Sequence, residues 1–291
     1  MNRRTKEGLL GYLFISPWLI GLIVFTVGPM VFSFLLIFAN WNLIGPLKFT
    51  GLQNLIDITK SNFFWSALRN TAFFTLYVPL SVFLSLIVAV LMDRNTHGTS
   101  IFRLIYFLPS VTPAVANAAV WVWLLQPSYG VVDNTLKNWF HIQGPGWLTD
   151  PNLYIPTLMM ISIWGSIGYN AVLFAAGLRS IDKSIYEAAQ LDGSGVISTF
   201  FKITLPLISP SIFFVTVTSV IWSFQVFDLA YMTNSGVTSY YNITLVQYIY
   251  QQGFQYFHIG EASAAAWVLA LIIFVITFFE LQAEKKLVFY Q

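Results

Sequence analysis

The sequence is poor in charged residues and contains no cysteine. Of its 291 residues only 9% are charged, whereas 57% are hydrophobic and 18% aromatic; soluble domains average about a quarter charged. The missing cysteine excludes disulfides, thiol nucleophiles and thiolate metal sites. The net charge of +2 offers no basic surface for nucleic acid, and three scattered histidines form no metal-ligand pattern. A surface this apolar cannot face mainly water, which predicts an integral membrane protein.

Motifs for chemistry are also missing. The sequence has no G-x-x-x-x-G-K-[ST] phosphate loop, so the chain is not expected to hydrolyse ATP itself. It has no H-E-x-x-H, no G-x-S-x-G and no buried pair of acids, which argues against a membrane-embedded enzyme. No cofactor is predicted. A transporter of this composition would have to draw its energy from another subunit.

Six runs without a charged residue are long enough to cross a bilayer, which takes about 20 apolar residues. A cleavable signal peptide is the alternative for the first run, but that run is too long and no small-residue cleavage site follows it. The sequence therefore predicts an all-α integral membrane protein with six transmembrane helices, near residues 9–38, 71–92, 104–126, 155–177, 207–229 and 262–281.

Basic residues divide unequally between the two sides of the membrane. With six spans, both termini share a side with the loops around 93–103 and 178–206. The basic residues on that side are Arg3, Arg4, Lys6, Arg94, Arg103, Arg179, Lys183, Lys202, Lys285 and Lys286. The other side holds only Lys48, Lys60, Arg69 and Lys137. Because lysine and arginine favour the cytoplasmic side, the N and C termini are predicted to be cytoplasmic.

The loop 178–206 is longer than a simple helix connection and carries helix signals of its own. Ser184 and Glu187 form a capping-box pattern that predicts a helix start, and Gly193 predicts its end. A second helical stretch is predicted from Val196 to Ile203. Such a short helix outside the bilayer can dock into a groove on a partner protein or rest on lipid headgroups. The residue pattern alone favours neither.

The same loop resembles the EAA motif of ABC importer permeases. The resemblance is carried by Glu187-Ala188-Ala189, Asp192-Gly193 and Ile203-x-Leu205-Pro206. Further stretches resemble the carbohydrate branch of that family, which includes the maltose and glycerol-phosphate permeases. They are Phe49–Asn54, Arg69–Thr71, Arg103 with Tyr106–Pro109, Ala176–Leu178 and Phe227–Asp228. The resemblance implies the type I ABC importer permease fold. Its implied parts are an N-terminal region 1–67, a permease core 68–282 that includes the coupling loop 178–206, and a tail 283–291.

The resemblance also implies partners and a coupling site. In such importers the motif helix docks into a cytoplasmic ATPase subunit, and closure of the ATPase pair moves the permeases. Carried to this sequence, the coupling residues are Glu187, Ala188, Ala189, Asp192 and Gly193. The plainer interpretation of Glu187 is that its carboxylate only closes the capping box. The expected partners are a second, homologous permease, two ATPases that bind ATP and magnesium, a solute-binding protein and a carbohydrate.

Family permeases line a central path with residues of the fourth and fifth spans. The corresponding candidates here are Ser166, Tyr169, Asn170, Ser219, Trp222, Ser223 and Gln225. An aromatic face with amides and hydroxyls suits a sugar, although serine and asparagine in spans also serve helix packing. Asp228 is added because it adjoins an apolar run. Relatives often follow this acid with Gly-Gly-Pro, whereas Asn234–Tyr241 stands here, which weakens any transfer of outer-loop contacts.

Two alternatives stay open at this point. A secondary transporter coupled to protons or sodium would place ionisable groups near the membrane midplane, and the six runs contain none. An ABC permease for another solute, such as glycerol phosphate, would favour arginine or lysine in its cavity. Because the spans supply neither, a neutral sugar or oligosaccharide is the preferred substrate.

Overall fold

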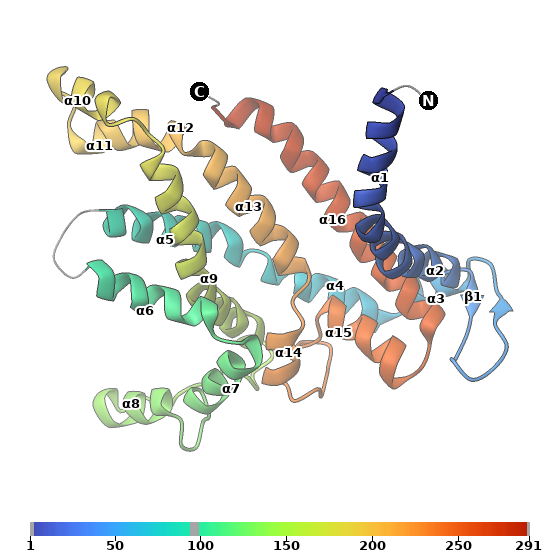
Figure 1. Cartoon of the computed structure of the whole chain (residues 1–291). Helices are drawn as coiled ribbons and strands as arrows, with labels where there is room; N and C mark the ends of the chain where they lie inside the picture. The colour runs from blue at the N-terminus through green and yellow to red at the C-terminus, as the bar shows by residue number, and fades with distance from the viewer. Residues whose placement is uncertain (1–2, 94–98, 290–291) are drawn as a thin grey trace. The chain divides into compact units, whose positions relative to one another are not determined.

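The computed structural model describes residues 3–93 and 99–289, and the chain divides into two compact units (Figure 1). Unit 1 comprises Met1–Asn62 and Ile249–Val268, and unit 2 comprises Phe63–Tyr248 and Leu269–Gln291. Arg94 of the predicted inner loop and residues 290–291 of the predicted tail lie outside the described residues. The predictions that fall on them are therefore not addressed by the structure.

Unit 1 contains a long helical stretch and a small antiparallel ladder. Asn54 links them, because its buried amide donates hydrogen bonds to the carbonyl oxygens of Ile37 at 2.8 Å and Ala39 at 2.9 Å. The ladder, with the register Ala39 to Phe49, departs from the predicted all-α fold. The elements are α1 (Arg3–Leu22), the π-helix η1 (Ile23–Val27), α2 (Gly28–Leu36), β1 (Ala39–Asn40), β2 (Lys48–Phe49), α3 (Gln53–Lys60) and the π-helix η3 (Gln251–Gln255).

Unit 2 is built from helices. Its elements are α4 (Asn62–Phe74), α5 (Tyr77–Asp93), α6 (Thr99–Val111), α7 (Ala114–Leu124), α8 (Val131–Phe140), α9 (Tyr154–Arg179), α10 (Lys183–Leu191), α11 (Val196–Thr199), the π-helix η2 (Phe200–Thr204), α12 (Leu205–Leu207), α13 (Ser209–Phe224), α14 (Asp228–Thr233) and α15 (Leu245–Tyr250). Helix α16 (Ile259–Leu287) begins in unit 1 and ends in unit 2.

The core of unit 2 lies along α9. Helices α5, α6 and α13 pack against α9 (Figure 1). One buried cluster, which includes Phe74, Tyr77 and Leu158, lies where α9 begins. A second cluster, which includes Met92 and Phe174, lies where α9 ends. The two clusters fix both ends of α9 within the unit.

Two predicted spans are interrupted in the structure. The prediction of one helix over 104–126 is wrong, because α6 and α7 meet at an angle of 108°. Pro113 lacks the N–H that a continuous helix needs, and a proline disfavours helical geometry in the residue before it, here Thr112. The predicted helix 207–229 ends early at Phe224, and Asp228 begins the separate helix α14. At the beginning of the predicted helix 207–229, the chain bends by 64° between α12 and α13.

The other predicted spans agree in type and differ at their ends. Among the described residues, the helices long and apolar enough to cross a membrane are Gly11–Leu36, Asn62–Met92, Tyr154–Arg179 and Ile259–Lys286. The second of them begins well before the predicted residue 71. Six spans result when each of the two bent helix pairs counts as one. The number of spans and the side of each terminus stay predictions.

Asn70 and Thr71 fasten the segment that follows α14 to α4. The amide of Asn70 donates hydrogen bonds to the carbonyl oxygens of Tyr240 and Ile243, both at 3.0 Å. The hydroxyl oxygen of Thr71 accepts a hydrogen bond from the backbone N–H of Leu245 at 2.8 Å. All of these bonds span more than 160 positions of sequence. They explain why polar residues stand near the end of α4, just before the apolar helix α5.

Gly168 determines how closely α6 approaches α9. A Cβ atom at this position would overlap the backbone carbonyl of Tyr106, and backbone cannot yield as a flexible side chain can. We expect Gly168→Ala to destabilise the purified protein by about 1–3 kcal/mol, the usual cost of overpacking. Thermal unfolding in detergent measures the effect.

Gly165→Ala is the matched control on the same helix, because its Cβ would meet only the Asn117 side chain at 3.5 Å. Equal unfolding temperatures for the two variants would contradict the expectation.

Candidate functional site

Helix α10 begins with a different cap from the predicted one. Asp182 is the N-cap, with extended backbone geometry, and its carboxylate accepts a hydrogen bond from the Ser184 backbone N–H at 2.9 Å. The predicted capping box is therefore wrong, because Ser184 already lies inside the helix. A carboxylate two residues earlier satisfies the free N–H groups equally well, so the helix starts sooner. The hydrogen bond from the Ser184 N–H holds the pKa of Asp182 below its ordinary value.

Helix α10 ends at Leu191, and Gly193 stops it as predicted. This glycine has a φ of +75°, a conformation that costs other residues energy. Its N–H donates to the Gln190 carbonyl at 3.0 Å, and the Ser194 N–H donates to the Ala189 carbonyl at 2.9 Å. The two bonds form a Schellman motif. The chain can therefore reverse abruptly into α11.

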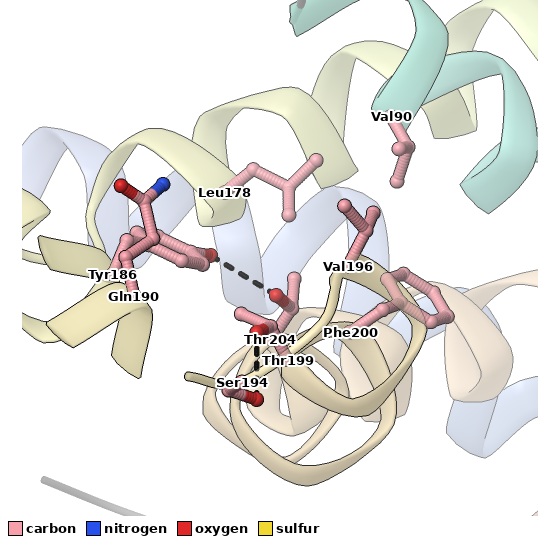
Figure 2. Close-up of a pocket in the computed structure, with 9 residues that line it drawn as sticks. All are labelled: Val90, Leu178, Tyr186, Gln190, Ser194, Val196, Thr199, Phe200 and Thr204. Carbon is pink, nitrogen blue, oxygen red and sulfur yellow. Dashed lines mark hydrogen bonds between the residues drawn. The ribbon is translucent and has the colours of Figure 1, made fainter. Parts of the chain in front are cut away.

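The loop 178–206 is held firmly against the end of α9. Ile181 belongs to the buried cluster at that end. The Tyr186 and Thr204 hydroxyls are hydrogen-bonded at 3.2 Å, and the Thr199 hydroxyl donates to the Ser194 hydroxyl oxygen at 3.1 Å (Figure 2). These contacts surround a hollow of about 320 Å³ between α10 and the helices that follow it. Side chains of α10 therefore pack against a cluster that also holds residues of α9 and α13.

Four of the five predicted coupling residues are exposed on this loop. Glu187, Ala188, Asp192 and Gly193 are accessible, whereas Ala189 is on the buried face of α10. The prediction did not include the apolar side chains that stand beside them. Leu191 is 90% exposed, and Val196 and Ile197 are also largely exposed. Leu191 lies one turn after Glu187 on the same face, and that spacing could have identified it.

A cavity of about 640 Å³ opens among the helices of unit 2. It contains five of the eight predicted substrate-path residues, namely Ser166, Tyr169, Asn170, Ser219 and Trp222. The aromatic rings of Tyr169 and Trp222 are 55% and 72% exposed. The other lining residues are Tyr77, Pro109, Ser110, Thr112, Ala114, Asn117, Ser162, Gly165, Phe214 and Thr218. None of the residues that line this cavity in the described part of the chain is charged.

Two amide atoms on the cavity wall are buried without a hydrogen-bond partner in the structure. They are the Asn170 Nδ2 donor and the Asn117 Oδ1 acceptor. Asn170 is only 5% exposed. A buried polar atom without a partner is costly, so these two amides stand out among the polar groups of the cavity wall.

The other predicted path residues lie elsewhere. Ser223 is buried, and its hydroxyl is hydrogen-bonded to the Thr75 hydroxyl at 2.9 Å and to the Val220 carbonyl. Gln225 is exposed at the C-cap of α13, and Asp228 is exposed in the first turn of α14. Neither lines the cavity. Ser166 does line it, but its hydroxyl is also bonded to that of Ser81 at 2.7 Å.

The wall that α6 and α7 contribute was absent from the prediction. Asn117 is the only amide within the apolar helix α7, and a polar residue in such a run is a signal of function. The break at Thr112 and Pro113 brings the beginning of α7 to the cavity. A continuous helix over 104–126 would have placed these residues differently.

Comparison with known proteins connects these features to one family. The family described as "Binding-protein-dependent transport system inner membrane component" matches residues 64–283. The probable ABC transporter permease YesP of Bacillus subtilis is 36% identical, covering 98% of this chain and 94% of that protein. The lactose transport permease LacF of Rhizobium radiobacter is 34% identical, covering 95% of this chain and 94% of that protein.

A solved structure supports the fold. One chain of a bacterial ABC transporter involved in the import of the acidic polysaccharide alginate matches with a TM-score of 0.87 at 25% identity. The match covers 98% of both chains.

The cap at Asp182 predicts a pH dependence of α10. Because the folded-state pKa lies below the ordinary value of 3.8, the cap stabilises α10 at neutral pH and is lost as the pH falls through that lowered pKa. We expect Asp182→Ala to accelerate hydrogen exchange at Ser184 at neutral pH. Asp182→Asn should keep the protection and lose its pH dependence.

Hydrogen exchange of the purified protein, followed by mass spectrometry, tests this expectation. Unchanged protection of Ser184 in Asp182→Ala at neutral pH would show that the cap does not hold the helix start.

Proposed function

The chain belongs to the family of inner-membrane components of binding-protein-dependent transport systems, the permease subunits of ABC importers for sugars or related substrates, and on this premise we propose that it transports a neutral sugar or oligosaccharide. In this proposal six spans cross the membrane and both termini are cytoplasmic. The permease core corresponds to 68–282, preceded by an N-terminal region 1–67 and followed by a tail 283–291.

The uncharged cavity of unit 2 is the observation that carries the substrate class. Tyr169 and Trp222 offer ring faces to the apolar side of a pyranose. Asn117 and Asn170 offer a free acceptor and a free donor to its hydroxyls. Pockets that combine aromatic walls with a few directed polar groups suit small organic ligands.

An anionic substrate is less well supported. A phosphate or a carboxylate is best held by arginine or lysine, and the described residues that line the cavity include neither. The names of the relatives do not decide the charge, because LacF is a lactose permease and the matched solved structure imports the acidic polysaccharide alginate. We therefore keep Ser166, Tyr169, Asn170, Ser219 and Trp222 as path residues. Ser223, Gln225 and Asp228 are left out of the contact set.

The loop 178–206 is the proposed site of energy coupling. Glu187, Ala188, Asp192 and Gly193 form the contact with a cytoplasmic ATPase, and Ala189 is on the buried face of α10. The balance of three basic and three acidic residues in this loop supports a protein partner, because a helix on anionic headgroups usually carries an excess of basic residues. The firm attachment of the loop to α9 suits the transmission of movement.

The complete importer needs further subunits. Two ATPases bind ATP and magnesium, a second permease completes the path, and a solute-binding protein delivers the sugar. Products of genes next to that of this chain are the natural candidates for co-purification.

Charge reversal at Glu187 tests the coupling. We expect Glu187→Lys to leave membrane insertion intact and to abolish the ATP hydrolysis that the sugar stimulates in the reconstituted importer, because the charge contacts the ATPase. Lys202→Glu, a reversal of an exposed charge in the same loop, should retain activity. Wild-type hydrolysis in Glu187→Lys would refute the coupling role.

Removal of the free donor at Asn170 tests the cavity. Loss of one neutral hydrogen bond costs roughly 0.5–1.5 kcal/mol, so Asn170→Ala should weaken the apparent affinity for the transported sugar about two- to tenfold. Gln225→Ala, outside the cavity, is the control. Uptake into proteoliposomes measures both, with glycerol phosphate and a uronic acid oligomer as competitors. Inhibition by an anionic competitor alone would contradict a neutral substrate.

A further inference from the structure

Helix α8 is amphipathic, and neither the cavity nor the coupling loop involves it. The apolar face carries Val132, Leu136, Trp139 and Phe140, at a spacing that repeats every helical turn. The opposite face carries Asp133, Asn134 and Lys137, and continues to His141 at the end of the helix. This second face lines a polar hollow of about 320 Å³. One side of α8 is therefore suited to water and the other is not.

Two hydrogen bonds fix α8 at the beginning of α9. The Trp147 indole N–H donates to the Asp133 carboxylate at 2.7 Å, and Asp133 is buried. The Trp147 carbonyl oxygen accepts a hydrogen bond from the Thr157 hydroxyl at 2.9 Å. Thr157 lies in the first turn of α9. Trp147 thus connects α8 directly to the end of a helix that can cross a membrane.

That position corresponds to a membrane boundary. Helix α9 has 26 residues and a length of about 39 Å at the usual rise, which exceeds the hydrocarbon thickness. The coupling loop follows the other end of α9, so α8 and α10 lie at opposite boundaries. Figure 1 shows them at the two ends of unit 2. With α9 as a span, exposed side chains on α8 would lie at the depth of the lipid headgroups.

Two of the side chains exposed on α8 are aromatic. Trp139 is 79% and Phe140 is 62% exposed. Tryptophan is enriched at membrane interfaces, where its ring can meet both acyl chains and water. Lys137, on the polar face, can extend its ammonium group towards the headgroups. A helix with one aromatic face and one polar face fits the interfacial plane.

We propose that α8 lies in the membrane–water interface at the Tyr154 end of α9, with Trp139 and Phe140 inserted among lipids. The apolar face of α8 therefore contacts lipid. Through its connection to α7, the anchored helix holds the cavity wall that carries Asn117. This goes beyond the transport function, and it holds whichever solute is transported.

The missing cysteine makes the test direct. Single cysteines replace Trp139 or Phe140 on the apolar face and Asn134 on the polar face of the full-length chain, and each receives a spin label. The protein is reconstituted into vesicles of phosphatidylethanolamine and phosphatidylglycerol. Collisions with oxygen, which concentrates in lipid, and with a water-soluble nickel chelate are compared by electron paramagnetic resonance.

Labels at 139 and 140 should collide several-fold more with oxygen than with nickel, and the label at 134 should do the reverse. Thermal unfolding at the wild-type temperature shows that each variant is folded. Equal nickel exposure at 134 and 139 would overturn the proposal. So would spin–spin coupling between labels of two chains, which would assign the face to a second copy.

Discussion

Apolar side chains of α5 and α9 meet along both helices, with a buried cluster at each end of their contact. Unit 2 depends on this packing. The cluster at the end of α9 takes in Ile181 and is covered by Tyr186 of the loop. The cavity opens along the middle of α9. Because close-packed interiors transmit strain, the proposed coupling would carry a push on α10 through this packing to the cavity walls.

Much of this arrangement follows from local sequence signals. Runs without charge identify the helices that can cross a membrane, since a charge inside a bilayer is expensive. Gly193 identifies the end of α10 because few other residues accept its positive φ. Tyr169 and Asn170 were candidates because of the family resemblance, and both do line the cavity.

The features that were missed depend on contacts distant in sequence or on competition between similar signals. Asp182 and Ser184 are both good N-caps, and only the folded chain shows which of them the helix uses. Pro113 could have kinked a helix slightly, whereas the structure turns by 108° there. Ser223 carries the same hydroxyl as Ser219, yet its hydroxyl is bonded to that of Thr75, in the turn between α4 and α5. No pattern within α13 distinguishes the two serines.

The close approach at Gly168 has a consequence for how such a protein can diversify. The position next to it, Tyr169, has its ring in an open space, while Gly168 itself leaves no room for even a methyl group. Of these two neighbouring positions on α9, one therefore excludes any side chain and the other accommodates a large ring. If the cavity is the substrate path, as proposed, side-chain exchanges at Tyr169, Trp222 or Asn117 would change specificity while the helix crossing stays as it is. New substrate preferences would then need no change in the packing of the helices.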